Sequence, residues 1–285
     1  MVEGPNIRPV KANGMTLSVD DWGGSGRGIL FVHPTGFLGA VWKPVITALR
    51  RLGFEGRILS FDQRGHGRSS KPDQGYEWEN FGADLLALMT SLGLEGMLGV
   101  GHSAGATTIA CVATAEPKRF RRLVLIDPIL FDREMAFIFE STTHPMVERT
   151  RTRRLVWSSR AELFESYRRR EPYESWTEEA LRAYVDFGTF ERPDGEVELW
   201  CPGRIEAQIY ENSTKLDGFD YLKRLARPAL VVRGENSGSF LAEKAEKAMR
   251  CLDDGRLVTL AGTSHFVPME VPAQVAELII AEFDA

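Results

Sequence analysis

The stretch Gly101-His102-Ser103-Ala104-Gly105 has the pattern G-x-S-x-G and follows the short apolar run 97–100. Residues 106–115 after it are small and apolar, which favours a helix directly behind the serine. A serine at a strand-to-helix turn adopts a sparsely populated backbone conformation, and glycines two positions away let the neighbouring chain pass without a Cβ clash. That strain presents the hydroxyl to a substrate. The stretch therefore predicts a nucleophile elbow with Ser103 as the nucleophile.

The composition is that of an ordinary globular chain. Its 285 residues are 43% hydrophobic with a net charge of −5, enough for one large α/β domain or for a core that carries an insertion. The dispersed charge argues against nucleic acid as a partner. Cys111, Cys201 and Cys251 are too far apart for a disulfide framework or a C-x-x-C metal site. Residues 1–14 lack the apolar core of a signal peptide, and no apolar run approaches the ~18 residues that span a bilayer. We expect a cytoplasmic monomer or homodimer with no membrane partner.

Strand and helix patterns alternate along most of the chain. Asn13-Gly14 between the runs 7–12 and 15–22 predicts a β-hairpin, because both turn residues tolerate a positive φ. Further short apolar runs predict buried strands at 28–32, 57–61, 97–100, 123–126, 229–232 and 256–260. Helical spacing favours helices at 42–49, 80–92, after Ser103, and at 272–283. This order predicts a mainly parallel sheet of about eight strands with helices on both faces.

The alternation stops between about residues 131 and 216. We find no buried-strand run there, but several helical stretches with N-cap signals at Ser159 and Thr177. The pattern predicts an α/β core made of 1–130 and 217–285, with 131–216 inserted as a helical cap. No internal repeat is evident.

A serine hydroxyl is a poor nucleophile until a base takes its proton, so the elbow requires a histidine at the same edge of the sheet. The chain has five histidines: His33, His66, His102, His144 and His265. His265 is the best candidate because it lies in the loop after the last strand, and the chain order serine, acid, histidine is the one this architecture uses.

Three motifs together give the chain a resemblance to the α/β-hydrolase superfamily over nearly its whole length. They are the D-x-R-G-H-G-x-S segment 62–69, the elbow 101–105 and the histidine loop 262–266. We interpret 62–69 as structural, because its glycines shape a turn and its Asp and Arg can satisfy backbone groups.

The resemblance implies two backbone amides that hold the oxyanion formed when a carbonyl is attacked. One is the N–H of Ala104, directly after the nucleophile. The other belongs to the loop after the third strand, where many family members have His-Gly-x and this chain has His33-Pro34-Thr35. Proline has no N–H, but the matching donor is the third residue, so the Thr35 amide is expected to serve.

The chain departs from the common pattern at the acid. Most relatives have Gly-x-x-Asp after the strand that resumes the core, and here Gly234-Glu235-Asn236-Ser237 puts serine in the aspartate position. Some relatives carry the acid at the end of the preceding core strand, which is the place of Asp127. We predict Asp127 as the acid, held extended by Pro128. Glu235, a cap carboxylate such as Glu206, or no acid at all are the alternatives.

The predicted cap is rich in arginine and in aromatic residues. A solvated helix face is the usual explanation of such a cationic cluster, and binding of a carboxylate-bearing substrate is the alternative. We expect the aromatic residues mainly to pack within the cap. The arginines are Arg149, Arg151, Arg153, Arg154, Arg168, Arg169 and Arg170, and the aromatic residues are Trp157, Phe164, Tyr167, Trp176, Tyr184 and Phe187.

These residues predict hydrolysis of a small, largely apolar carboxylic ester through an acyl-enzyme, with no metal or organic cofactor. A serine nucleophile argues against the family's epoxide-opening and halide-removing reactions, which use aspartate. Lactonase, thioesterase, amidase, C–C hydrolase, lyase and perhydrolase activities use the same residues and stay open. A ligand-binding or regulatory protein with a weakened triad is the alternative from another class, because position 237 lacks the usual aspartate.

Overall fold

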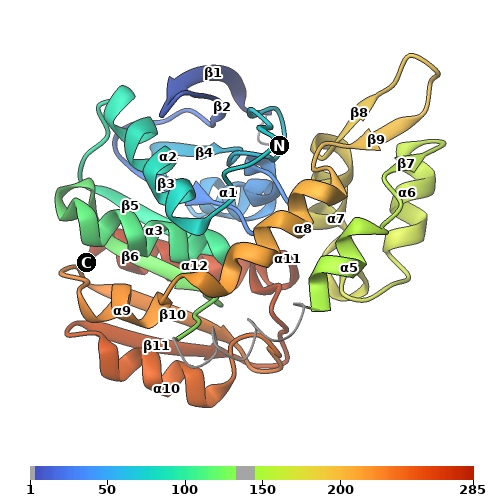
Figure 1. The fold of residues 1–285 in the computed structure, drawn as a ribbon. Helices are drawn as coiled ribbons and strands as arrows, with labels where there is room; N and C mark the ends of the chain where they lie inside the picture. The colour runs from blue at the N-terminus through green and yellow to red at the C-terminus, as the bar shows by residue number, and fades with distance from the viewer. Residues whose placement is uncertain (1–3, 133–144) are drawn as a thin grey trace.

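The computed structural model describes residues 4–132 and 145–285, and its centre is an eight-stranded sheet (Figure 1). The strand order is β1-β2-β4-β3-β5-β6-β10-β11. The strands are β1 Asn6–Ala12, β2 Met15–Asp21, β3 Ser25–Val32, β4 Gly56–Phe61, β5 Met97–His102, β6 Phe120–Ile126, β10 Ala229–Gly234 and β11 Gly255–Leu260. All neighbours from β4 to β11 pair in parallel, whereas β1 and β2 form an antiparallel edge. The predicted mainly parallel sheet is confirmed.

The hairpin at the N-terminal edge follows the predicted turn. Ala12 pairs with Met15, and Asn13 and Gly14 between them have φ values of 48° and 71°. Two positive φ angles in a two-residue loop match the right-handed twist of the strands on either side. The local sequence therefore determines this edge.

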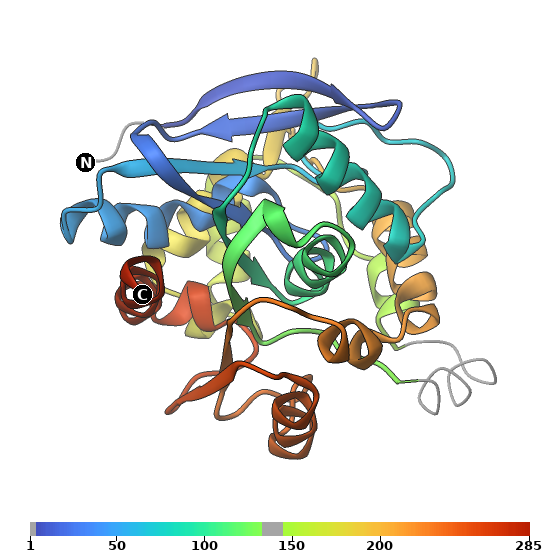
Figure 2. The same ribbon diagram turned by 90° about the vertical axis from the view of Figure 1, so that its left-hand side faces the viewer.

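Helices cover both faces of the sheet (Figure 2). One face carries α2 Trp78–Ser91, α3 Ala104–Ala115, α9 Gly218–Lys223 and α10 Ala242–Cys251, and the other carries α1 Lys43–Arg51, α11 Val267–Glu270 and α12 Pro272–Asp284. In β3, Ile29 and Phe31 join the core on one face, and Leu30 and Val32 join the core on the other. A strand that is buried on both faces has no polar side to alternate with, which explains its continuous apolar run.

The segment between β6 and β10 forms the predicted insertion, which is mainly helical. Its helices are α5 Pro145–Arg151, α6 Arg160–Tyr167, α7 Glu178–Phe187 and α8 Gly203–Asn212. It also holds a small antiparallel sheet, β7 Val156–Trp157, β9 Val197–Leu199 and β8 Thr189–Glu191, which the sequence did not predict. Strands of two or three residues are too short to show a period-2 pattern. Part of the predicted range, 133–144, lies outside the described residues, and the boundaries 131–216 stay a prediction.

Short 3₁₀ turns complete the described chain. They are η1 Gly39–Trp42, η2 Pro117–Arg119, η3 Tyr173–Ser175 and η4 Ser213–Lys215. No helix within 4–132 or 145–285 has the length and apolar character needed to cross a bilayer.

The cap lies over the end of the sheet where the parallel strands finish. Phe37, in the loop after β3, packs against Tyr184 of α7 with ring centroids 5.0 Å apart. The N-cap hydroxyl of α7, Thr177 Oγ1, accepts a hydrogen bond from Ala180 N, and Thr177 N donates to Met269 O of α11. The cap is thus tied to the loops that follow the strands.

Candidate active site

Ser103 lies on a sharp turn between β5 and α3, as the motif predicts. Its φ of 57° and ψ of −124° are strained for a residue with a side chain. A Cβ at Gly101 would lie 2.6 Å from Ala106 Cα, and one at Gly105 would lie 2.3 Å from Val32 O. Both approaches involve backbone atoms, so neither glycine can be replaced without moving the turn.

The structure brings Ser103, His265 and Asp127 together from three separate loops. His265 follows β11, and its Nε2 lies 3.0 Å from Ser103 Oγ. Its Nδ1 lies 2.6 Å from Asp127 Oδ1. Ser103 follows β5 and Asp127 follows β6, so all three stand at the carboxyl ends of parallel strands. The arrangement can pass a proton from the serine to the imidazole while the carboxylate orients the ring.

Asp127 is fully buried and accepts hydrogen bonds on both carboxylate oxygens. Besides His265, Ser237 Oγ donates to Oδ1 at 2.7 Å and Gly234 N donates to Oδ2 at 3.1 Å. The expectation that Pro128 holds Asp127 extended was wrong, because its φ is 42°. Aspartate is one of the few side chains that tolerate this left-handed region.

The other two carboxylates considered for this role lie elsewhere. Glu235 Oε2 accepts a hydrogen bond from Gly262 N at 2.8 Å and so braces the loop that carries His265. Glu206 forms an ion pair with Arg153. Of the three candidates, Asp127 is the one in contact with the imidazole.

The two predicted oxyanion donors lie side by side. Thr35 and Ala104 line the same small cavity, which has room for about one water molecule. Its other lining residues are Gln63, Trp78, Phe81, Thr108 and Ile209. Ala104 is the first residue of α3, so its amide belongs to the positive end of a helix. The cavity is therefore large enough for a single oxygen atom of a substrate and not for a larger group.

Two buried histidines shape the loop that carries Thr35. Gly36 N donates to His66 Nε2 at 2.9 Å, and Gln63 N donates to His33 Nε2 at 3.0 Å. Both rings therefore accept on Nε2 and donate from Nδ1, to Arg64 O and Pro34 O. Burial lowers the pKa of His33 to about 4 and that of His66 well below its usual value. The segment 62–69 thus supports the oxyanion loop through its backbone and imidazole contacts.

Six of the seven arginines in the cationic cluster of the cap are exposed, and Arg153 alone among them is partly buried. Four of them form exposed ion pairs: Arg151 with Glu211, Arg154 with Glu162, and Arg168 and Arg169 with Glu165. Arg153 turns inward to Glu206 and to the hydroxyl of Tyr184. The sequence offers no signal that separates Arg153 from its neighbours, because all lie in one short charged run.

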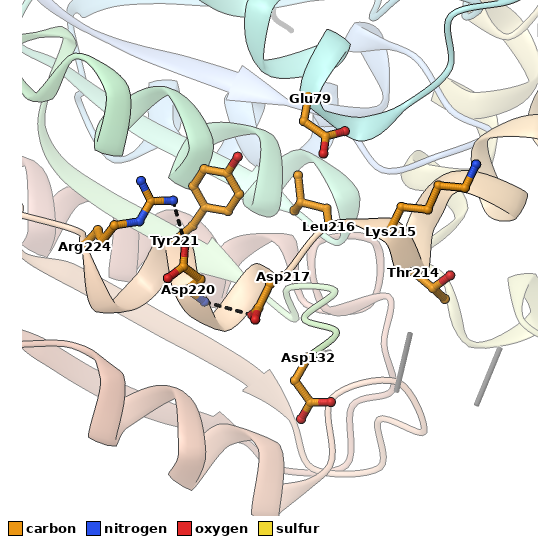
Figure 3. A pocket seen from close by; sticks show the side chains of 9 residues that line it. All are labelled: Glu79, Asp132, Thr214, Lys215, Leu216, Asp217, Asp220, Tyr221 and Arg224. Atoms are coloured by element: carbon orange, nitrogen blue, oxygen red, sulfur yellow. Dashed lines mark hydrogen bonds and ion pairs between the residues drawn. The ribbon is translucent and has the colours of Figure 1, made fainter. Parts of the chain in front are cut away.

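A second hollow among the described residues, shown in Figure 3, has none of Ser103, His265 and Asp127 in its lining. It measures about 230 Å³, and its lining is charged: Glu79, Asp132, Thr214, Lys215, Leu216, Asp217, Asp220, Tyr221 and Arg224. Three of the carboxylates are already engaged, since Asp217 caps α9, Asp220 pairs with Arg224 and Asp132 pairs with Lys247. Within the described ranges, no cluster of His, Cys, Asp and Glu side chains is arranged to hold a metal ion.

Comparison with known proteins finds the chain similar to a family of hydrolases. The model of the "Alpha/beta hydrolase family" matches residues 29–278. A 2-(acetamidomethylene)succinate hydrolase of Mesorhizobium japonicum is 27% identical over 97% of this chain and 94% of its own length. A non-heme haloperoxidase of Rhodococcus erythropolis is 26% identical over 89% of this chain and 90% of its own. The crystal structure of an E-2-(acetamidomethylene)succinate hydrolase superposes with a TM-score of 0.86 at 26% identity, covering 99% of this chain and 100% of that one.

Proposed function

The chain belongs to the alpha/beta hydrolase family, and from that premise we propose that it is a serine hydrolase that cleaves a carboxylic ester of a small substrate. The observation that supports this is the unbroken hydrogen-bond chain from Asp127 through His265 to Ser103. A strained serine, a basic imidazole and a buried carboxylate in this order are the parts of a nucleophile that forms an acyl-enzyme.

In the proposed reaction, Ser103 Oγ attacks the ester carbonyl while His265 Nε2 takes its proton. The amides of Thr35 and Ala104 hold the resulting oxyanion, and Asp127 stabilises the imidazolium through Nδ1–H. The imidazolium then protonates the leaving alcohol as the C–O bond breaks. Water, activated by the same imidazole, attacks the acyl-enzyme and releases the acid, which restores Ser103.

A fluorophosphonate probe tests this function against that of a ligand-binding protein without turnover. The probe forms a covalent bond with an activated serine, so we expect mass spectrometry to find one label on the wild type. Ser103→Ala should take no label, and His265→Ala should react at least about 10²-fold more slowly, because the serine loses its base. Ser158→Ala is the control, since this exposed hydroxyl donates to Glu162 Oε2 and, among the described residues, makes no other hydrogen bond. A folded wild-type protein that stays unlabelled would exclude the proposal.

Amide cleavage is the second candidate for the same residues. The relative at 27% identity is named for a substrate with an acetamido group. Turnover of 4-nitrophenyl acetate and of 4-nitroacetanilide by the wild type compares the two bonds directly. We expect the ester to react faster, because its leaving group needs less protonation. A higher kcat/KM for the anilide would make amide cleavage the better assignment.

A further inference from the structure

Arg153 differs from the other cap arginines in its burial. The side chains of Arg151 and Arg154, on either side of it, are 51% and 53% exposed, whereas that of Arg153 is 17% exposed. Removing a guanidinium from water is unfavourable unless its charge and its N–H groups find partners. The inward position of Arg153 is therefore favourable only if neighbouring groups satisfy its charge and its N–H groups.

Contacts place Arg153 on the cap side of the oxyanion loop. Its Nη1 donates to Glu206 Oε2 at 2.6 Å, and its Nη2 lies 3.3 Å from the hydroxyl of Tyr184. Glu206 lies against Gly36, where a Cβ would be 2.5 Å from Glu206 Oε1. Gly36 directly follows Thr35. One carboxylate thus separates the guanidinium from the loop that carries a proposed oxyanion donor.

The protein leaves part of this guanidinium unpaired. A guanidinium has five N–H groups in a planar fork, and the buried Nε of Arg153 finds no hydrogen-bond partner within 4–132 and 145–285. Burial lowers the pKa of Arg153, but the neighbouring Glu206 carboxylate opposes this, and the guanidinium keeps its charge. Burial also raises the pKa of Tyr173 and of Tyr184, which keeps both hydroxyls protonated. The surroundings of Arg153 are rich in hydrogen-bond donors.

The cavity next to the two proposed oxyanion donors has little space. It has room for about one water molecule, and Trp78, Phe81 and Ile209 are among the residues that line it. Trp78 Nε1 donates to Ile209 O at 3.1 Å, which fastens the cap helix α8 over this end. A cavity of this size cannot hold a whole ester, so most of a substrate lies outside it. Glu206 and Ile209 are three residues apart and therefore on one face of α8, which places Arg153, the partner of Glu206, near this end of the site.

We propose that Arg153 binds a carboxylate on the leaving group of the substrate, so that the substrates are short-chain acyl esters of hydroxy acids. The inference rests on the proposed function and names the substrate class of the same site. A planar fork of N–H donors matches the two oxygens of a carboxylate. Glu206 holds the guanidinium in place without substrate and competes with the substrate carboxylate for it.

A matched pair of substrates tests the charge itself. These are 4-acetoxybenzoate and its methyl ester, which share the acetyl group and the phenol but differ in charge. We expect the wild type to prefer the acid in kcat/KM. Arg153→Met should lower the acid-to-methyl-ester ratio by about 10- to 100-fold, mainly through KM, as expected for a hydrogen bond to a charged group. Arg153→Lys, which keeps the charge without the fork, should retain part of the preference.

Glu206→Gln distinguishes binding from a purely structural ion pair. If Arg153 binds substrate, removing the competing carboxylate should raise the acid-to-methyl-ester ratio, opposite in direction to Arg153→Met. If the pair only holds the cap, both variants should lower turnover of both substrates alike. Arg154→Met is the matched control, because it removes a neighbouring exposed arginine and should leave the ratio unchanged.

A binding measurement separates this inference from the proposed function. Calorimetry of Ser103→Ala with 4-hydroxybenzoate, and with its methyl ester as the neutral control, needs no turnover. We expect the acid to bind more tightly, and the difference to vanish when Arg153→Met is added. Equal binding of the acid and its methyl ester overturns the carboxylate site even if the wild type hydrolyses esters. Tighter binding of the acid without any hydrolysis would support the site and overturn the proposed reaction.

Discussion

Asp127 meets His265 because the chain turns sharply at the end of β6. Its N–H still donates to Val232 O at 2.7 Å, and its φ of 42° then turns the side chain toward the loop after β11. Three donors converge on the carboxylate, from His265, Ser237 and Gly234. An ionised carboxylate accepts all three, whereas an amide has only one acceptor oxygen.

We therefore expect Asp127→Asn to lower kcat by about 10³- to 10⁴-fold, because an amide N–H facing Nδ1 selects the wrong tautomer of His265. Steady-state kinetics with 4-nitrophenyl acetate measures the effect, and circular dichroism checks the fold. Glu235→Gln is the matched control and should stay within a few-fold of the wild type. The reverse result would make Glu235 the acid.

Ser237 explains how the site tolerates the missing aspartate. Its hydroxyl lies 2.7 Å from the oxygen of Asp127 that also contacts His265. Ser237 Oγ in turn accepts hydrogen bonds from Ser239 N and Phe240 N. The residue at the usual acid position thus holds the carboxylate that we propose as the acid in its place. The sequence showed only the departure at 237, and not this contact.

The elbow is the element on which the site depends most. It brings α3 against the end of β3, so that Gly105 lies beneath the oxyanion loop. The helix starts at Ala104, and its N-terminus points toward the site because Ser103 reverses the chain there. One turn therefore positions both the proposed nucleophile, Ser103, and a proposed oxyanion donor, Ala104.

Gly105→Ala should destabilise the protein by about 2 kcal/mol or more, because its Cβ would lie 2.3 Å from Val32 O and 2.7 Å from His33 O. Esterase activity should fall with it, as the turn must shift. Urea denaturation followed by fluorescence gives the free energy of unfolding. Gly238→Ala is the control, since a Cβ there meets nothing within 4 Å. Equal stability of the two variants would contradict the argument.

The cap is held to the core by aromatic packing rather than by its charges. Phe37 of the oxyanion loop contacts Trp176, Tyr184 and Phe266, with ring centroids between 5.0 and 6.1 Å apart. An exposed ion pair between core and cap, such as Arg51 of α1 with Glu179 of α7, contributes little. The cap therefore rests on the same loops that carry Thr35 and His265.

At the scale of the whole molecule, the buried histidines couple stability to pH. His33 has a folded pKa of about 4 against about 6.5 when unfolded, so the unfolded chain binds more protons between these values. The free energy of unfolding should be highest above pH 6.5 and fall as the pH drops toward 4, by about 3 kcal/mol from this residue. The pKa of His66 is also lowered by burial, so this residue too reduces the free energy of unfolding as the pH falls.

Urea denaturation at several pH values between 7.5 and 4.5 measures this slope. His33→Gln is the informative variant, because its amide oxygen can still accept the hydrogen bond from Gln63 N but does not titrate. Its stability should depend less on pH than that of the wild type. An unchanged slope would show that the neutral imidazole of His33 does not contribute.

The sequence by itself determined the framework. Strand and helix patterns are local, so the apolar runs, the Asn13-Gly14 turn and the elbow predicted all eight strands of the main sheet. Ser103 and His265 followed from the same patterns, since both occupy loops whose place is set by the order of the strands. The short strands of the cap were not predicted, because two or three residues are too few to show the alternation of apolar and polar side chains that marks a strand.

Only the tertiary structure decided which side chains meet. Asp127 and Ser237 are 110 positions apart, and Arg153 and Glu206 are 53 apart. Such contacts depend on loop conformation and on how the cap sits on the core. The positive φ of Asp127 and the inward turn of Arg153 have no local signature, because each is favourable only through partners that the rest of the fold supplies.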